Sequence, residues 1–281
     1  MVTTRILNFL SLMMTHPRDA FDRLEGIVDL RWERLLPRPF QYDACEFNAL
    51  LGSLEKATGY PLSQFLEEPA FLQIEEQVQA ELSALPQDAP FPAFMNGDLT
   101  LARLCYVLSR AHQPMHVVET GVCYGVTTAF VLQAIKENGR GWLHSVDLPP
   151  LGKQADQFIG KVVPARLRSR WQFHRGSSKH LLHRLLTEIG SVGLFVHDSL
   201  HTYRNIRREL ELITKFLSPG ALVICDDIEG NPAFHEWIDK VRPGYSQTLK
   251  QQNKSSLVGV AAFLDAKSRD LQPDCEATAQ A

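Results

Sequence analysis

The residues of this chain best suited to chemistry are acids that follow short apolar segments. Glu119 ends one such segment, a glycine turn runs from Gly121 to Gly125, and Asp147 ends a second segment. An amphipathic stretch lies between the turn and the second segment. This order is that of a strand, a turn, a helix and a strand, and in open α/β sheets ligands bind outside the carboxyl ends of the strands. The two acids are therefore placed to accept hydrogen bonds from an amine and from a ribose diol.

The glycine pattern indicates which nucleotide-like ligand fits. A dinucleotide fingerprint needs G-x-G-x-x-G, because its middle glycine lets backbone amides approach a pyrophosphate. Cys123 occupies that middle place, and Glu119 puts negative charge before the turn, where phosphates would be repelled. S-adenosylmethionine has no phosphate and carries an ammonium, a sulfonium and a ribose. The residues favour this cofactor, while an NAD-type oxidoreductase on a Rossmann-like fold, or a βαβ unit whose glycines only permit tight packing, are the alternatives.

A second group of acids follows two later apolar segments. Asp198 follows one segment and Asp226 and Asp227 follow the other, so neighbouring parallel strands would bring three carboxylates together. Clustered carboxylates repel unless a cation neutralises them, and such oxygen ligands suit Mg²⁺ or another divalent cation. His201, three residues after Asp198, is placed to act as a general base near neutral pH. Alternatively, the two later acids only cap a helix, and His201 is only a helix residue held by a carboxylate.

Apolar segments and amphipathic stretches alternate through the middle of the chain. The segments expected as strands are Val117–Glu119, Leu143–Val146, Gln172–His174, Gly193–His197 and Ala221–Cys225. Such alternation predicts an α/β fold, a mostly parallel Rossmann-like sheet with helices on both faces. Two late apolar runs flank a polar loop and predict a C-terminal antiparallel hairpin, Ser246–Leu249 with Leu257–Leu264.

The first part of the chain has a different pattern. Residues 1 to about 95 show helical periodicity and no convincing strands, and prolines divide them into short helices. The proline-rich run at 86–92 is the best candidate boundary, and Asp98 is the expected N-cap of the next helix. We therefore expect a helical N-terminal cap or lid region at 1–95, an S-adenosylmethionine-binding domain at 96–265 and a disordered tail at 266–281.

Composition sets limits on location and partners. The chain has 281 residues, 44% hydrophobic and 22% charged, as in ordinary globular proteins. A net charge of −3 gives no reason to expect nucleic acid or an anionic membrane surface as partner. The apolar run Ile6–Met14 is too short to span a bilayer, so no stable membrane insertion is expected. Five scattered cysteines without a C-x-x-C pair suit a reducing compartment and predict a cytoplasmic protein.

Several motifs together resemble a known family. They are E-T-G-V-C-Y-G, S-V-D-L-P-P, R-G-S-S, H-D-S-L-H-T-Y, L-S-P-G-A-L-V-I-C-D-D and N-P-A-F, spread over Asn96 to Leu264. In order and spacing they resemble the class I S-adenosylmethionine-dependent methyltransferases. Within that class they are most similar to the branch that includes the macrocin-type sugar O-methyltransferases, with catechol O-methyltransferase as a more distant relative.

The resemblance implies roles for named residues. Glu119 and Gly121 match the turn around the methionine part of the cofactor, Asp147 matches the ribose acid, and the loop after the third strand matches the adenine contact. The implied cofactor-binding set is Glu119, Gly121, Gly125, Asp147, Gly176, Ser177, Ser178 and Asp198.

The resemblance also implies a metal and a base. Asp198, Asp226 and Asp227 match positions that hold a divalent metal in metal-dependent members, and His201 matches a proposed base of the sugar O-methyltransferases. The family pattern after the fourth strand is closer to D-G-x-H, and Ser199 replaces its glycine here. The implied activity is divalent-metal-assisted O-methylation of a hydroxyl on a small molecule or sugar, by a monomer or a homo-oligomer. A non-catalytic scaffold that retains the fold is the competing interpretation.

Overall fold

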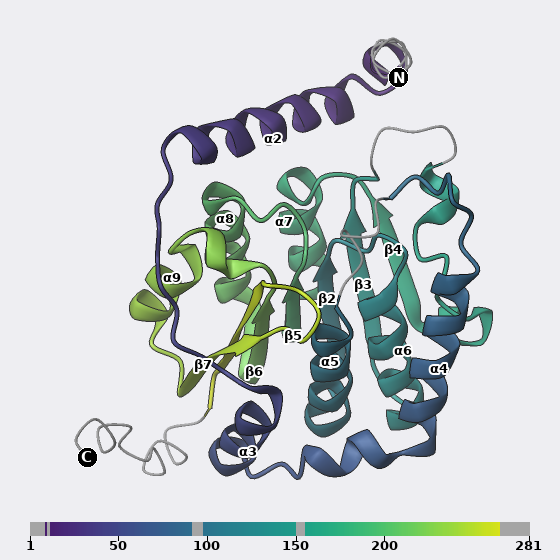
Figure 1. The fold of residues 1–281 in the computed structure, drawn as a ribbon, viewed down its shortest axis with the longest axis vertical. Coiled ribbons are helices and arrows are strands. Elements are labelled where there is room, and N and C mark those ends of the chain that lie inside the picture. The colour runs from purple at the N-terminus through teal and green to yellow at the C-terminus, as the bar shows by residue number, and fades with distance from the viewer. Residues whose placement is uncertain (1–8, 10–11, 92–97, 150–154, 265–281) are drawn as a thin grey trace.

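The computed structural model describes residues 9, 12–91, 98–149 and 155–264, which form an eight-stranded sheet flanked by helices (Figure 1). The order across the sheet is β1-β7-β8-β6-β5-β2-β3-β4. Strands β2 to β6 are parallel, and β8 is antiparallel to both β6 and β7. The strands are β1 (Ala44–Cys45), β2 (His116–Thr120), β3 (Trp142–Asp147), β4 (Trp171–Arg175), β5 (Val192–His197), β6 (Leu217–Cys225), β7 (Tyr245–Lys250) and β8 (Leu257–Ala262). The predicted Rossmann-like sheet with a C-terminal antiparallel hairpin is confirmed.

The predicted strand boundaries differ most at β6. This strand begins at Leu217 rather than at Ala221, because Leu217 pairs with Val192 across an irregular stretch of register. The residues Ser218, Pro219 and Gly220 are typical of a loop, but here they form the irregular beginning of the strand. Its carboxyl end at Cys225 agrees with the prediction, and that end carries the acids of the site.

Helices cover both faces of the sheet and bury a separate core under each (Figure 1). Helices α3 (Phe47–Thr58), α4 (Pro69–Ser83), α5 (Leu99–His112) and α6 (Val126–Asn138) contribute to one core. Helices α7 (Ser178–Ile189), α8 (Tyr203–Ile213) and α9 (Ala233–Val241) contribute to the other. Short 3₁₀ helices lie at Ser63–Glu67, Ala155–Phe158, Ala165–Arg170, Thr214–Phe216 and Ile228–Gly230. Asp98 caps α5 as predicted, since its carboxylate accepts a hydrogen bond of 2.6 Å from the Thr100 amide.

The N-terminal part is more closely joined to the sheet than its helical pattern indicates. The expectation of no strand before residue 95 is wrong at β1, which pairs in parallel with Thr248 and Leu249 of β7. Two residues are too few to show an alternating pattern, so only the pairing identifies this strand. Residues 266–281, where we expected a disordered tail, lie outside the described residues. None of the described helices is long and apolar enough to cross a membrane.

Helix α2 (Pro17–Leu35) runs across the carboxyl ends of the parallel strands (Figure 1). Only Ala20 and Asp29 of this helix are buried, so apolar packing contributes little to its position. Polar contacts hold it to the domain instead. They are the ion pairs Asp19–Arg175, Glu25–Lys179 and Asp29–Arg204 and the 3.0 Å hydrogen bond between Asp22 and His180. The helix therefore lies over the sheet edge where the acids predicted to carry chemistry are found.

Candidate active site

Two strand-end acids and a histidine meet at the carboxyl edge of the sheet. Parallel pairing continues one residue beyond β5 and β6, since the Asp198 amide donates to the Thr120 carbonyl and the Asp226 amide to the His197 carbonyl, each at 2.8 Å. Asp198, His201 and Asp226 each offer one ligand atom, and these atoms all lie within 4.8 Å of one another. The structure thus brings together two of the three predicted metal ligands, with the predicted base beside them.

Asp227 lies on the other side of the histidine ring. Asp227 has a left-handed backbone (φ +50°), and its carboxylate contacts His201. Asp227 Oδ2 is 3.2 Å from His201 Nδ1, and Asp198 Oδ1 is 3.6 Å from His201 Nε2. The ring therefore lies between two carboxylates, and Asp227 is positioned to orient it.

This arrangement changes the protonation of His201. Burial by itself lowers the pKa of His201, but the neighbouring Asp198 and Asp227 carboxylates raise the pKa to about 10. The ring is therefore an imidazolium at neutral pH in the ion-free protein. To act as a base, His201 must first lose this proton, and positive charge placed at the carboxylates favours that loss.

Asp226 is the most deeply placed acid of the site. It is 1% exposed, and its Oδ1 accepts a hydrogen bond of 2.5 Å from Gln251 Nε2 in the loop between β7 and β8. Burial and the adjacent Asp198 and Asp227 carboxylates raise its pKa well above the ordinary range, although Lys254 of the same loop opposes this. Sequence reasoning missed Gln251 and Lys254, because the hairpin loop gives no sign of folding back over this edge.

The predicted ribose acid also shapes the glycine turn. Asp147 Oδ2 accepts hydrogen bonds from the backbone amides of Val122 and Cys123, at 3.1 and 3.0 Å. Gly121 has φ +88°, and a Cβ there would lie 1.8 Å from the Asp198 carbonyl oxygen. Only glycine fits at this position, so the turn packs directly against the loop that carries the candidate metal ligand.

Glu119 lies beneath the turn. It is 1% exposed, and its Oε2 accepts hydrogen bonds from Thr128 Oγ1 at 2.8 Å and from Ser145 Oγ at 2.6 Å. Burial raises the pKa of Glu119 to about 8 despite these donors. The structure therefore places this predicted cofactor residue under the turn, where its hydrogen bonds join β2 to α6 and β3.

The other predicted cofactor residues lie along the same edge. Gly125 is the N-cap of α6 with φ +91°, and a Cβ there would lie 2.7 Å from Val163 Cγ2. The Gly176 amide donates to the Asp147 carbonyl at 2.8 Å, which holds the adenine-side loop against the ribose acid. Ser177 caps α7 through the Lys179 amide, whereas the Ser178 hydroxyl donates to Glu209.

Glu209 is the centre of a buried hydrogen-bond network behind the site. Its carboxylate is 0% exposed and accepts bonds from donors on several elements. These donors are Thr120 at 2.6 Å, Ser199 at 3.0 Å, Asn205 at 3.2 Å and Ser178, with His197 Nδ1 at 2.8 Å. Burial alone would raise the pKa of Glu209, but His197 and the hydroxyl donors hold it at about 2. The carboxylate is therefore ionised and ties the ends of β2 and β5 to α7 and α8.

Sequence reasoning missed Glu209, although one signal was available. It lies beside Ile206 and Leu210 on the apolar face of a predicted helix, and an acid on a buried face needs donors. The network also explains Ser199, the departure from the family pattern. Its hydroxyl donates to Glu209 and accepts from Asn205, a hydrogen-bonded role that a glycine cannot fill.

Comparisons with known proteins agree with this geometry. Residues 118–228 match a family model described as a methyltransferase domain. An O-methyltransferase from Bacillus cereus in complex with SAH aligns with TM-score 0.52 and 14% identity, over 74% of this chain and 99% of that one. A putative O-methyltransferase from Klebsiella pneumoniae aligns with TM-score 0.51 and 16% identity, over 77% and 97%. The O-methyltransferase TomG from Streptomyces achromogenes, in complex with SAM, aligns with TM-score 0.50 and 16% identity, over 70% and 91%. No curated protein sequence matches the chain significantly.

The family match and the shared fold together define the class of this protein. Residues 118–228 match a methyltransferase domain, and the sheet in which they lie has the class I methyltransferase fold. The predicted resemblance is confirmed at the level of this class. At such low identities the solved structures show the fold alone, so the narrower similarity to sugar O-methyltransferases stays a prediction.

Proposed function

We propose that the chain is an S-adenosylmethionine-dependent O-methyltransferase that acts, with a divalent cation, on a hydroxyl of a small molecule or sugar. The observation that carries this proposal is the meeting of Asp198, His201 and Asp226 at the edge that also holds the glycine turn. One side of this edge offers groups for an amine and a ribose. The other offers charge and a proton acceptor for a hydroxyl.

The residues present fit a divalent cation. Asp198 and Asp226 offer hard oxygen ligands, and a cation bound between them would offset the burial and the neighbouring acids that disfavour the charge of Asp226. Gln251 Oε1 and Asp227 Oδ1 are buried oxygens without a hydrogen-bond partner among the described residues, as expected where a cation completes the site. A divalent cation bound there would supply Lewis-acid polarisation, which lowers the pKa of an acceptor hydroxyl.

The side chains of this protein would then bind and position the reactants. Asp147 and the amides that it fixes would hold the ribose, since a carboxylate accepts from both hydroxyls of a diol. Asp227 would hold the His201 ring through Nδ1, which leaves Nε2 to receive the acceptor proton. Most of the rate gain would come from holding the oxygen near the sulfonium methyl, because reacting atoms at near-attack distance avoid a large entropic cost.

Calorimetry with S-adenosylhomocysteine tests the cofactor part of the proposal. Wild type should bind, and Asp147→Ala should lose roughly 1–3 kcal/mol of binding free energy with the ribose hydrogen bonds. Asp88→Ala, at an exposed position, is the matched control and should bind like wild type. NADH should not bind. Equal affinity in the Asp147 variant, or tighter binding of NADH, would overturn the assignment.

A further inference from the structure

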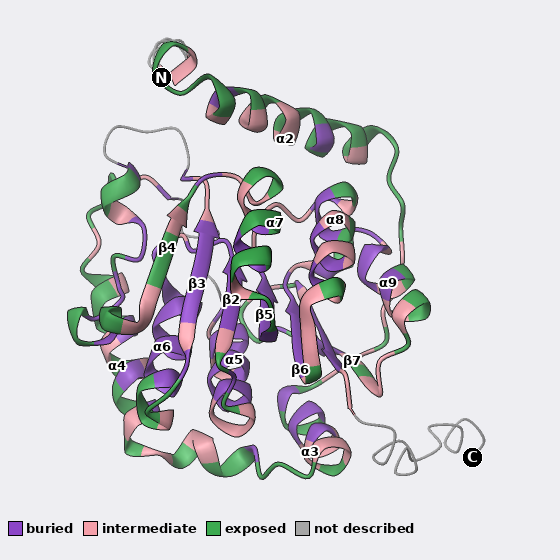
Figure 2. Cartoon of the chain, turned by 180° about the vertical axis from the view of Figure 1, so that it is seen from behind, coloured by how far each residue is buried: buried purple, intermediate pink, exposed green. Residues whose placement is uncertain are grey.

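Helix α2 has two chemically different faces. An apolar stripe recurs at three- and four-residue steps and is formed by Phe21, Leu24, Val28, Trp32 and Leu35. These side chains are 40% to 73% exposed, and Figure 2 shows the outer side of α2 as largely exposed. The opposite face carries the acids that pair with the domain. An amphipathic helix normally buries its apolar face. In α2 the polar face packs inward instead, and none of the described residues covers the apolar stripe.

The charges of α2 are sorted in the same way. All of its acids are buried or half-buried towards the domain, whereas its exposed charged residues are Arg18, Arg31 and Arg34. Arg38, just after the helix, is also exposed. The chain's net charge of −3 conceals this arrangement, because the fold turns the acids of the helix inward and three of its four arginines outward.

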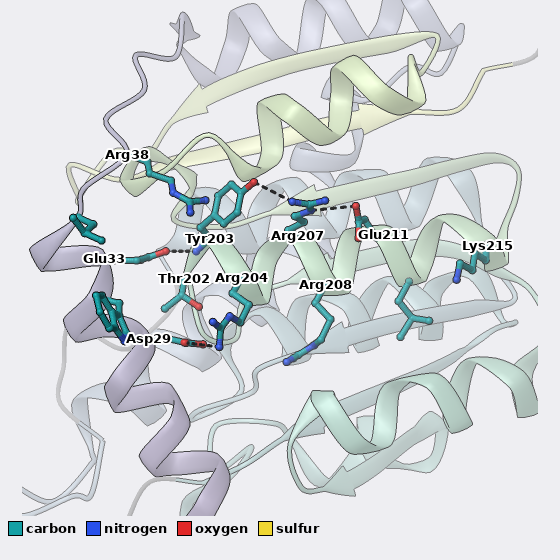
Figure 3. A pocket seen from close by; sticks show the side chains of 13 residues that line it. Asp29, Glu33, Arg38, Thr202, Tyr203, Arg204, Arg207, Arg208, Glu211 and Lys215 are labelled. Carbon is teal, nitrogen blue, oxygen red and sulfur yellow. Dashed lines mark hydrogen bonds and ion pairs between the residues drawn. The ribbon is translucent and has the colours of Figure 1, made fainter.

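A basic groove continues this surface between α2 and α8. It encloses about 710 Å³, and Trp32 and Leu36 of the α2 side line it together with Arg207, Arg208 and Lys215 of the α8 side (Figure 3). Arg38 lies over the Tyr203 ring at 4.0 Å from its centre. Among the described residues, no carboxylate oxygen lies within 4.0 Å of a side-chain nitrogen of Arg38 or Lys215, so neither residue forms an ion pair. Asp29, Glu33 and Glu211 also line the groove, and Asp29 and Glu211 pair with Arg204 and Arg207. Arg38 and Lys215 are therefore the cations that the groove keeps available to an external anion.

We propose that the apolar stripe of α2 and the basic groove dock the protein peripherally on an anionic phospholipid bilayer. Helices that lie in a membrane interface combine Trp, Phe and Leu side chains with arginines, and each basic residue near an anionic surface adds attraction. The stripe would enter the boundary between headgroups and acyl chains, while Arg31, Arg34 and the groove contact lipid phosphates. This inference is independent of methyl transfer, since it concerns a surface outside the candidate active site.

Charge favours the bilayer over a second copy of the chain. Two α2 stripes packed together would join helices whose exposed charges are all positive, because the acids are engaged within each domain. The apolar area of the stripe is also too small for a stable dimer. A helix of 19 residues is about 28 Å long, and one stripe of it covers much less than the roughly 800 Å² that each partner of a stable dimer buries.

Cosedimentation of the full chain with vesicles tests the proposal. Wild type should sediment with vesicles of mixed phosphatidylcholine and phosphatidylglycerol, weakly with phosphatidylcholine alone, and less when NaCl is raised to about 1 M. The double variant Leu24→Gln, Val28→Gln and the double variant Arg31→Glu, Arg34→Glu should each lower the partition coefficient about 10-fold or more. The matched controls are Leu72→Gln, exposed on α4, and Lys56→Glu with Lys136→Glu, exposed on α3 and α6.

Each other outcome identifies a different role for the surface. Equal binding to neutral and anionic vesicles, no binding, or equal losses in the control variants would overturn the proposal. Sedimentation velocity without lipid should show a wild-type protein that does not self-associate through α2. Self-association that the α2 variants abolish would assign the stripe to a second copy of the chain. If a variant fails to fold, the fluorescence of Trp32 in the wild type provides a second test. The Trp32 contribution, identified as the part of the emission that Trp32→Phe removes, should be quenched by brominated lipid and should not change with free glycerol phosphate. If brominated lipid does not quench Trp32, or if free glycerol phosphate alone prevents that quenching, bilayer docking would also be contradicted.

Discussion

At the scale of single residues, His201 links proton occupancy to cation occupancy. The ring lies 3.2 Å from Asp227 and 3.6 Å from Asp198, and it carries a proton at neutral pH when no cation is bound. A cation and an imidazolium compete for the same carboxylates. Deprotonation of the proposed base is therefore favoured only when the site is loaded.

Replacing His201 should separate catalysis from cofactor binding. His201→Ala should lower kcat by roughly 10²–10⁴-fold, the usual contribution of a general base, with nearly unchanged affinity for S-adenosylhomocysteine. The loss should be smaller for a phenolic acceptor, whose own pKa is near 10. Steady-state kinetics with His235→Ala as the control, a half-exposed histidine on α9, checks this. Weaker cofactor binding with unchanged turnover would make His201 a packing residue.

Asp226 should matter for cation binding and little for the ion-free fold. Burial and its acidic neighbours raise the pKa of Asp226 and so disfavour its charge, and Asp226→Asn in EDTA should stay within about 1 kcal/mol of wild type. Mg²⁺ should raise the melting temperature of wild type and of Asp88→Asn but not of Asp226→Asn. A Mg²⁺ response that survives in Asp226→Asn would remove the cation from this site.

At the scale of elements, the turn after β2 is the part of the site least tolerant of change. A Cβ at position 121 would overlap the Asp198 carbonyl, and the backbone there is left-handed. Gly121→Ala should therefore destabilise the fold by roughly 2–4 kcal/mol and abolish cofactor binding. Gly52→Ala is the control, because no atom lies near a Cβ in that helix and alanine favours helix by up to about 1 kcal/mol. Chemical unfolding of both variants should show opposite signs.

The elements also show what the sequence can and cannot predict. The alternating apolar segments predict β2 to β6 and their acids, because strand-end position follows directly from chain order in a parallel sheet. The contacts of Gln251 with Asp226 and of Glu209 with Thr120 join residues far apart in the chain. No local pattern encodes such pairs, and the same holds for the packing of α2 against the domain through its polar face.

At the scale of the whole molecule, a row of histidines makes the fold sensitive to acid. His144 is 5% exposed, and its Nε2 lies 3.1 Å from His116 Nδ1. Burial, with His116 and His174 nearby, lowers the pKa of His144 from 6.5 to about 4. Between these values the unfolded chain binds a proton that the folded chain does not, so stability is lost as the pH falls from about 6.5 to about 4.

Removing that histidine should reduce the acid sensitivity. From pH 7 to pH 5, wild type should lose about 2 kcal/mol through this group, and His144→Gln should lose correspondingly less. His183→Gln, at an exposed position of α7, should leave the pH dependence unchanged. Urea unfolding at the two pH values measures both, and identical slopes in wild type and His144→Gln would show that other groups set the acid limit.

The carboxylate of Glu209 has a consequence for how this protein can evolve. Because one buried anion satisfies Thr120, Ser178 and Ser199 together with His197, the fitness effect of a change at any of these positions depends on the others. Serine at position 199 is tolerated because the anion is there to receive its hydroxyl. Loss of the anion would leave several buried donors unsatisfied at once. The positions behind the site therefore form one epistatic unit, and substitutions in it should be accepted in a preferred order, with the donors replaced before the acceptor is lost.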